Sequence, residues 1–99
     1  MTKMELEKIL ETIRRIKPTL EKRYKVKSLA LFGSYVRGEQ KKTSDVDILV
    51  EFSEDADLFD LIALEEFLTE KLGIKVDVVP KNALRSELRE SVFREAIKV

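Results

Sequence analysis

Two short strands with one amphipathic helix between them restrict the fold of this chain more than any other feature. Residues 45–52 alternate apolar and polar side chains, as a strand with one buried face requires. Apolar side chains then recur at helical spacing over residues 58–72, a helix that Asp57 can cap. Residues 74–79 form a second apolar strand, which Pro80 stops. A whole helix between two strands favours parallel neighbours joined by a right-handed crossover.

The rest of the chain supplies one more strand and further helices. A first helix is expected to follow a capping-box pattern at residues 2–5 and to break or kink at Pro18. Residues 28–32 have the short apolar character of a buried strand, although its direction relative to the next strand is undecided. A last helical region starts at Asn82, and residues 96–99 can fray or add an edge strand. Strands that alternate with helices predict an α/β architecture in which helices cover a small sheet.

Length and charge limit the classes of protein to which this chain can belong. Ninety-nine residues suffice for one domain, residues 1–99, with one core. Nineteen basic and nineteen acidic side chains balance, so bulk charge gives no reason to expect direct binding to nucleic acid or to a membrane surface. Residues 1–44 carry twelve basic and five acidic side chains, whereas residues 45–99 carry seven and fourteen. We expect the two halves to fold together and neutralise each other.

Absent residue types exclude several chemistries. The chain has no cysteine, which excludes a disulfide framework, a thiolate metal site and a cysteine nucleophile, and it has no histidine. Any general base must therefore be a carboxylate, a lysine, a tyrosine or a metal-bound hydroxide. No segment approaches the roughly 18 apolar residues of a membrane span, and the N-terminus has no apolar signal region. A soluble cytoplasmic protein is the expected default.

A Gly33-Ser34 pair directly follows the strand at residues 28–32. Glycine allows a tight turn into a short helix, and the N–H groups at a helix start can hold an anion together with the Ser34 hydroxyl. A triphosphate is the obvious candidate. A Gly-Ser pair after a strand is also common as a simple turn, and at this point both interpretations stay open.

Three aspartates lie on the two strands that flank the central helix. Asp45 and Asp47 are two residues apart and point to the same side, so a divalent cation would offset their repulsion. Asp77 lies in an otherwise apolar strand, where burial of its charge would be costly without a cationic partner. If the strands are neighbours, the three carboxylates can surround one or two metal ions, as in nucleotidyl transfer. The alternatives are a solvated strand end for Asp45 and Asp47 and an edge strand that turns Asp77 to water.

The spacing of these residues resembles that of a known family. The pattern G-S-x-x-R-G-x-x-x-x-x-S-D-x-D-x-x-V is matched at every fixed position over residues 33–50, including Arg37, Gly38 and Ser44. It is similar to the minimal nucleotidyltransferase (MNT) domains of the DNA polymerase β superfamily, and the apolar strand with Asp77 extends the resemblance. The resemblance implies an α/β (α+β) nucleotidyltransferase fold, with a small mixed sheet of three to four strands flanked by four to five helices.

The resemblance also implies roles for individual residues, with Mg²⁺ as cofactor, two ions being expected, and ATP as substrate. Gly33 and Ser34 would hold the β- and γ-phosphates, and the first two aspartates would ligate both metal ions. Asp77 would ligate the catalytic ion and help to deprotonate the attacking hydroxyl. Arg37 could steady phosphate charge, or it could pair with Glu39 or another acidic neighbour. The implied site comprises three catalytic, metal-ligating carboxylates, Asp45, Asp47 and Asp77, and four nucleotide-binding residues, Gly33, Ser34, Arg37 and Ser44.

A partner protein is a further implication of the resemblance. Larger superfamily members carry a helical region that grips the acceptor, and this chain has no residues left for one. Similar domains are frequently paired with a HEPN-domain RNase toxin and act as antitoxins that transfer AMP from ATP to a tyrosine hydroxyl of that toxin. Two alternatives stay open: a non-catalytic module that masks a partner, and a transferase for a small molecule such as an aminoglycoside. The sequence leaves open whether the chain forms a homo-oligomer or a hetero-oligomer.

Overall fold

One mixed sheet of four strands forms the centre of the computed structural model, which describes residues 5–99. In the order of the sheet, the strands are β3 (Val76–Pro80), β2 (Val46–Phe52), β1 (Val26–Phe32) and β4 (Ile97–Lys98). β1 is antiparallel to both β2 and β4. β2 and β3 are parallel, which confirms the pairing predicted for the two strands on either side of the long helix.

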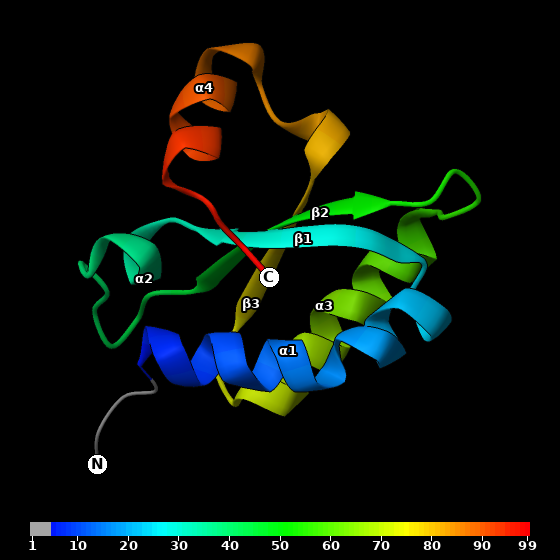
Figure 1. The fold of residues 1–99 in the computed structure, drawn as a ribbon, viewed down its shortest axis with the longest axis horizontal. Helices are drawn as coiled ribbons and strands as arrows, with labels where there is room; N and C mark the ends of the chain where they lie inside the picture. The colour runs from blue at the N-terminus through cyan, green and yellow to red at the C-terminus, as the bar shows by residue number, and fades with distance from the viewer. Residues whose placement is uncertain (1–4) are drawn as a thin grey trace.

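Within residues 5–99, four α-helices flank the sheet (Figure 1). α1 and α3 pack on one face, α4 lies on the other, and α2 is a single turn at the end of β1. A short 3₁₀ helix, η1, precedes α4. Their bounds are α1 (Leu6–Arg23), α2 (Ser34–Arg37), α3 (Leu58–Leu72), η1 (Lys81–Ala83) and α4 (Ser86–Glu95). The four-stranded mixed sheet and the four helices agree with the predicted fold.

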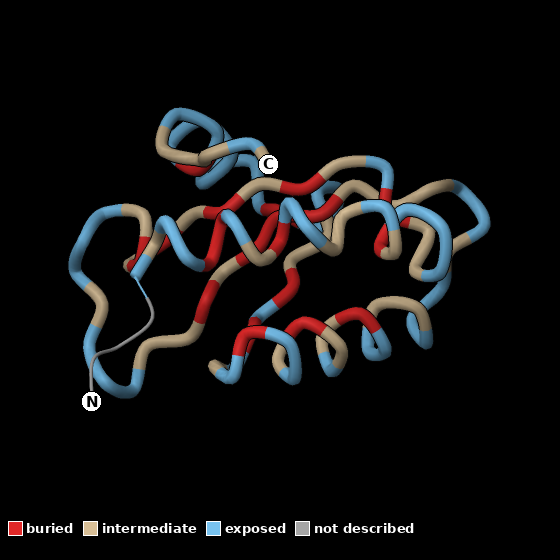
Figure 2. Tube along the Cα trace, turned by 60° about the horizontal axis from the view of Figure 1, so that its bottom comes forward, coloured by how far each residue is buried: buried red, intermediate tan, exposed pale blue. Residues whose placement is uncertain are grey.

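The main core lies between the sheet and the helices α1 and α3. Val46, Ile48 and Val50 of β2 are fully buried on this face, as the two-residue period of a strand requires. Figure 2 shows the buried segments of α3 on the side that faces the sheet. The other fully buried side chains of this core are Ile9, Ile13, Leu20, Leu31, Leu64, Leu68 and Val76.

A smaller apolar cluster attaches α4 to the opposite face of the sheet. It joins Leu49 of β2, Leu84 after η1 and Val92 of α4, with Phe32 and Val79 packed against it. Because Leu49 alternates with the core-facing residues of β2, this face also carries the other odd-numbered positions of that strand. The helix α4 therefore covers the face to which the aspartates of β2 belong.

The helix break predicted at Pro18 is wrong, because α1 is continuous from Leu6 to Arg23. A proline inside a helix removes one backbone hydrogen bond and crowds the preceding turn. Ile13 and Leu20 lie on either side of Pro18, two turns apart, and both are fully buried, so core packing favours one helix. The capping box predicted at residues 2–5 lies outside the described residues, apart from Glu5.

Two predicted ends differ from the structure, and a third agrees with one of the two alternatives predicted for residues 96–99. The strand predicted to stop before Pro80 includes it, since β3 is an edge strand where a missing N–H is tolerated. The last helical region divides into η1 and α4 instead of running on from Asn82. The final residues form the edge strand β4. No helix within residues 5–99 is long and apolar enough to cross a membrane.

The outer edge of β3 is occupied by side chains of α3. The Val76 N–H donates to Thr69 Oγ1 at 3.0 Å, and the Val78 N–H donates to Glu65 Oε2 at 2.9 Å. Pro80, the next residue with this orientation, has no N–H. The helix therefore contacts the strand that follows it both through the core and through hydrogen bonds to the strand's backbone.

We predict that Asp57→Ala destabilises the fold by about 1 kcal/mol, because it removes the N-cap of α3. The Asp57 carboxylate accepts the Asp60 N–H at 3.1 Å, and the Asp60 carboxylate accepts the Asp57 N–H at 2.9 Å, so the capping box is reciprocal. Urea unfolding should show a lower midpoint with an unchanged slope. The exposed Glu66→Ala variant of the same helix is the control, and equal loss in both would contradict a capping role.

Candidate functional site

The predicted site residues gather at one end of the sheet, on the face that α4 covers. Phe32, the last residue of β1, pairs with Asp47 of β2, and Asp47 pairs in turn with Asp77 of β3. Asp45 immediately precedes β2. Because Val46 is buried on the core face, its two neighbours point to the other face. Strand register thus brings the three aspartates to one end of the sheet, next to the turn that follows β1.

Gly33 and Asp47 approach each other so closely that residue 33 can have no side chain. Gly33 has φ +84° and ψ −158°, a backbone conformation that is essentially restricted to glycine. A Cβ atom at this position would overlap Asp47 Oδ2. The glycine therefore permits the turn into α2 and leaves the space that the Asp47 carboxylate occupies.

The ionised form of Asp47 is disfavoured in the folded protein. Burial, followed by the negative charges of Asp77 and Asp45, raises the pKa of Asp47 from 3.8 to about 6. Arg37 opposes this shift and Glu95 adds to it. These contributions place four carboxylates and one guanidinium close enough to influence one another. The site has an excess of negative charge that a cation would relieve.

Arg37 bridges two acidic residues in this structure, and its contact with phosphate stays a prediction. Its Nε donates to Glu39 Oε1 at 2.8 Å, and its Nη1 donates to both carboxylate oxygens of Glu95 at 3.1 Å. The Gly33 N–H donates to Glu95 Oε2 at 2.7 Å. A carboxylate from the end of α4 is thus held by the backbone N–H of Gly33, just before α2, and by the guanidinium of Arg37, the last residue of α2.

The remaining predicted nucleotide-binding residues lie at two places. Ser34 is the first residue of α2, beside Gly33, and Gly38 ends that helix in the left-handed conformation. The Ser44 hydroxyl accepts the Lys41 N–H at 2.8 Å and so closes the turn before Asp45. The structure therefore brings Ser34 to the Gly33 turn, whereas Ser44 shapes the loop that leads into β2.

The expectation that Asp77 is buried and needs a cation for that reason is wrong. β3 is at the edge of the sheet, and the Asp77 side chain is exposed. The apolar residues on either side of it, Val76 and Val78, are buried on the opposite face, which explains why the strand looked suited to burial. Asp77 nevertheless stays in register with Asp47.

Glu95 was not among the residues predicted from the sequence. The available signal was its position as the last residue of α4, where a negative charge opposes the helix dipole and calls for a cationic partner. That partner, Arg37, lies 58 residues earlier, and nothing in the local pattern connects the two.

A family model described as a nucleotidyltransferase domain matches residues 13–99. The chain belongs to the nucleotidyltransferase domain family. Protein adenylyltransferase MntA of Thermococcus cleftensis is 44% identical to it over 99 residues and covers 100% of both chains.

Three solved structures resemble this nucleotidyltransferase. One, provisionally described as a minimal nucleotidyltransferase, superimposes with a TM-score of 0.84 at 36% identity, over 97% of both chains. A toxin–antitoxin crystal structure with AMP-PNP gives 0.67 at 28% identity, over 93% of this chain and 69% of the other. A complex of the tri-AMPylated HEPN toxin of Shewanella oneidensis with an MNT antitoxin gives 0.63 at 25% identity, over 90% and 68%.

The acidic residues of this nucleotidyltransferase suit a divalent cation by their chemistry. Mg²⁺ prefers a few carboxylate oxygens together with water and phosphate oxygens. The pKa of Asp47 is raised first by burial and then by the negative charges of Asp77 and Asp45, which a cation would offset. Within residues 5–99, no group of three acidic side chains is already arranged to hold a metal ion. Strand register brings the carboxylates of Asp45, Asp47 and Asp77 to one end of the sheet. Rotation of these side chains would have to complete a set of metal ligands.

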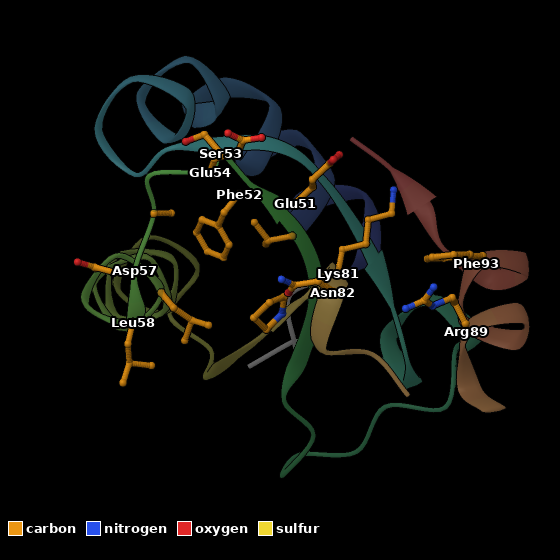
Figure 3. A pocket seen from close by; sticks show the side chains of 14 residues that line it. Glu51, Phe52, Ser53, Glu54, Asp57, Leu58, Lys81, Asn82, Arg89 and Phe93 are labelled. Carbon is orange, nitrogen blue, oxygen red and sulfur yellow. The ribbon is translucent and has the colours of Figure 1, made fainter. Parts of the chain in front are cut away.

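A cavity of about 760 Å³ lies away from the aspartates, at the other end of β2 (Figure 3). Phe52 of β2, Lys81 of η1 and Phe93 of α4 are among its lining residues. It contains none of the predicted site residues. The cavity is therefore a separate feature from the glycine turn and the aspartates, which lie at the opposite end of β2.

We predict that Asp47→Asn stabilises the fold above pH 6 by about 1 to 2 kcal/mol, which is less than the full pKa shift would give because solvent screens this half-buried carboxylate. With a pKa of about 6 in the folded state and 3.8 ordinarily, Asp47 binds its proton more tightly when folded, so wild-type stability falls as the pH rises from 4 to 6. The substitution removes that loss. Urea unfolding at pH 4, 5, 6 and 8 measures the difference.

Asp55→Asn is the control for this experiment. A hydrogen bond from Ser53 lowers the pKa of Asp55, the opposite direction to Asp47, so this substitution should not stabilise the protein at high pH. A difference between Asp47→Asn and wild type that is constant from pH 4 to pH 8 would contradict the electrostatic account.

Proposed function

We propose that this nucleotidyltransferase, with Mg²⁺, transfers AMP from ATP to a tyrosine hydroxyl of a HEPN-domain toxin and so acts as its antitoxin. The observation that carries the proposal is the register that sets Asp47 opposite Asp77, beside the Gly33 turn. Its similarity to a protein adenylyltransferase supports the reaction. Its similarity to chains of complexes with AMP-PNP and with an AMPylated HEPN toxin supports the nucleotide and the partner.

In the proposed reaction the tyrosine oxygen forms a bond to the α-phosphorus of ATP. The bond from that phosphorus to the bridging oxygen breaks, and pyrophosphate leaves with the electron pair. The proton of the tyrosine hydroxyl passes to the Asp77 carboxylate. Mg²⁺ held by Asp45, Asp47 and Asp77 would supply Lewis-acid stabilisation of the phosphate charge.

Donors for the terminal phosphates lie at the two ends of the single-turn helix α2. The Gly33 N–H and the Arg37 guanidinium already hold a carboxylate in this structure, with donor–acceptor distances of 2.7 and 3.1 Å. A phosphate group offers the same kind of anionic oxygen atoms to these donors. In the proposed complex the triphosphate therefore extends from the aspartates toward Arg37.

The exposure of Asp77 supports an acceptor that belongs to another protein. A base on an edge strand can be reached by a side chain presented from outside the sheet, whereas a buried base would need an internal acceptor pocket. The cavity at the other end of β2 contains none of the three aspartates. The open edge thus matches a reaction in which the partner brings its own tyrosine.

We predict that Asp77→Asn lowers the rate of AMP transfer by roughly 100-fold or more, because it removes the group that accepts the proton. The protein, the co-encoded HEPN partner and Mg-ATP are mixed, and intact-mass spectrometry counts the AMP groups on the partner. Chelation of Mg²⁺ should abolish transfer in the wild type.

Asp55→Asn is the matched control, because Asp55 is an exposed aspartate that follows β2, at the opposite end of that strand from Asp45 and Asp47. It should transfer AMP at the wild-type rate. Asp77→Asn with wild-type activity would overturn the assigned role. A partner that is inhibited but carries no AMP would instead favour masking, and transfer to a small molecule alone would favour the other alternative.

A further inference from the structure

Glu95 holds two donors that the proposed function assigns to ATP. Its Oε2 accepts the Gly33 N–H at 2.7 Å, and both of its carboxylate oxygens accept from Arg37 Nη1 at 3.1 Å. The first of these distances is short, as expected for a hydrogen bond to a charged acceptor. The Glu95 side chain is 26% exposed, so incoming ligands can reach it.

A carboxylate and a phosphate cannot use these donors at the same time. A backbone N–H has one hydrogen to donate, and the Glu95 carboxylate oxygen already accepts it where a phosphate oxygen would have to lie. Its charge would also repel a triphosphate at this distance. In this structure the Glu95 carboxylate therefore occupies the position that the proposed function gives to a phosphate group of ATP.

We infer that the Glu95 carboxylate competes with the nucleotide for the Gly33 N–H and the Arg37 guanidinium, and that its side chain rotates away before a triphosphate binds. The inference rests on the proposed function, since it concerns the same phosphate site. It makes Glu95 a residue that sets the affinity for the nucleotide.

The backbone on either side of Glu95 is fixed, so the movement is that of a side chain. Val92 is packed in the smaller apolar cluster, and its carbonyl accepts the Ala96 N–H at 2.9 Å. After β4, the Val99 N–H donates to the Leu29 carbonyl at 3.1 Å, and Lys17 Nζ donates to the Val99 carbonyl at 2.8 Å. Rotation about the three side-chain torsions of glutamate releases the donors without unfolding α4.

Arg37 keeps a partner when Glu95 leaves. Its Nε remains bonded to Glu39 at 2.8 Å, on a different nitrogen from the one that Glu95 uses. The guanidinium is therefore still held while Nη1 becomes available to a phosphate oxygen. Glu39 makes no contact with the Gly33 N–H in this structure, which makes it the matched control for Glu95.

Titration calorimetry of wild type, Glu95→Gln, Glu95→Ala and Glu39→Gln with Mg-AMP-PNP, and separately with inorganic tripolyphosphate, tests the inference. We expect Glu95→Gln to bind both ligands roughly 10-fold more tightly, because a neutral amide is a weaker competitor than a carboxylate. Glu95→Ala should bind at least as tightly as Glu95→Gln. Glu39→Gln should stay within about twofold of wild type, as is usual for an exposed ion pair.

Equal or weaker binding by both Glu95 variants, with thermal unfolding like that of wild type, would overturn the inference. Weaker binding in particular would show that Glu95 orients Arg37 instead of competing with the nucleotide. Failure of all four proteins to bind either ligand would overturn the phosphate site and the inference together. Tighter binding by the Glu95 variants, with no AMP transferred to the toxin by wild type, would leave the inference standing and overturn only the proposed acceptor.

Discussion

The contact between Gly33 and the Asp47 carboxylate is the constraint on which the rest of the site depends. It ties the end of β1 to the beginning of β2, and it leaves room for no side chain at residue 33. The same residue is the N-cap of α2, which carries Arg37. A displacement of either strand would therefore separate the carboxylates from the donors. Strand pairing fixes the relative position of both halves of the site, even though one half lies in a turn and the other on the sheet.

The site opposes folding electrostatically, and the opposite face of the sheet offsets the cost. Burial and then the neighbouring carboxylates raise the pKa of Asp47 to about 6, and one guanidinium nearby opposes them. Such clusters are typical of functional sites, where charge is arranged for a ligand and not for stability. The fully buried valines and isoleucine of β2 lie on the other face of the same strand. One strand thus carries a fully buried apolar row toward the core and, at one end of its other face, the carboxylate of Asp47.

Local periodicity was sufficient to predict most of the elements and the position of Asp45, Asp47 and Asp77 at one end of the sheet. Both follow from a period of two along a strand and from the parallel pairing that a helical connection favours. The features that the sequence did not predict depend on contacts between distant residues. Pro18 remains within α1 because the core holds the helix on both sides of it. Asp77 is exposed because β3 is at the edge of the sheet, and strand order cannot be read from a strand's own composition. Glu95 meets Arg37 only through the packing of α4.

The backbone hydrogen bonds along the outer side of β3 limit how another protein can dock there. Thr69 and Glu65 accept the two N–H groups that point away from the sheet, and Pro80 offers none. A neighbouring chain that tried to extend the sheet as a fifth strand would find these donors already used or missing. The edge that presents Asp77 is therefore protected against strand addition and against edge-to-edge aggregation. A partner can approach this carboxylate through side chains without being drawn into the sheet.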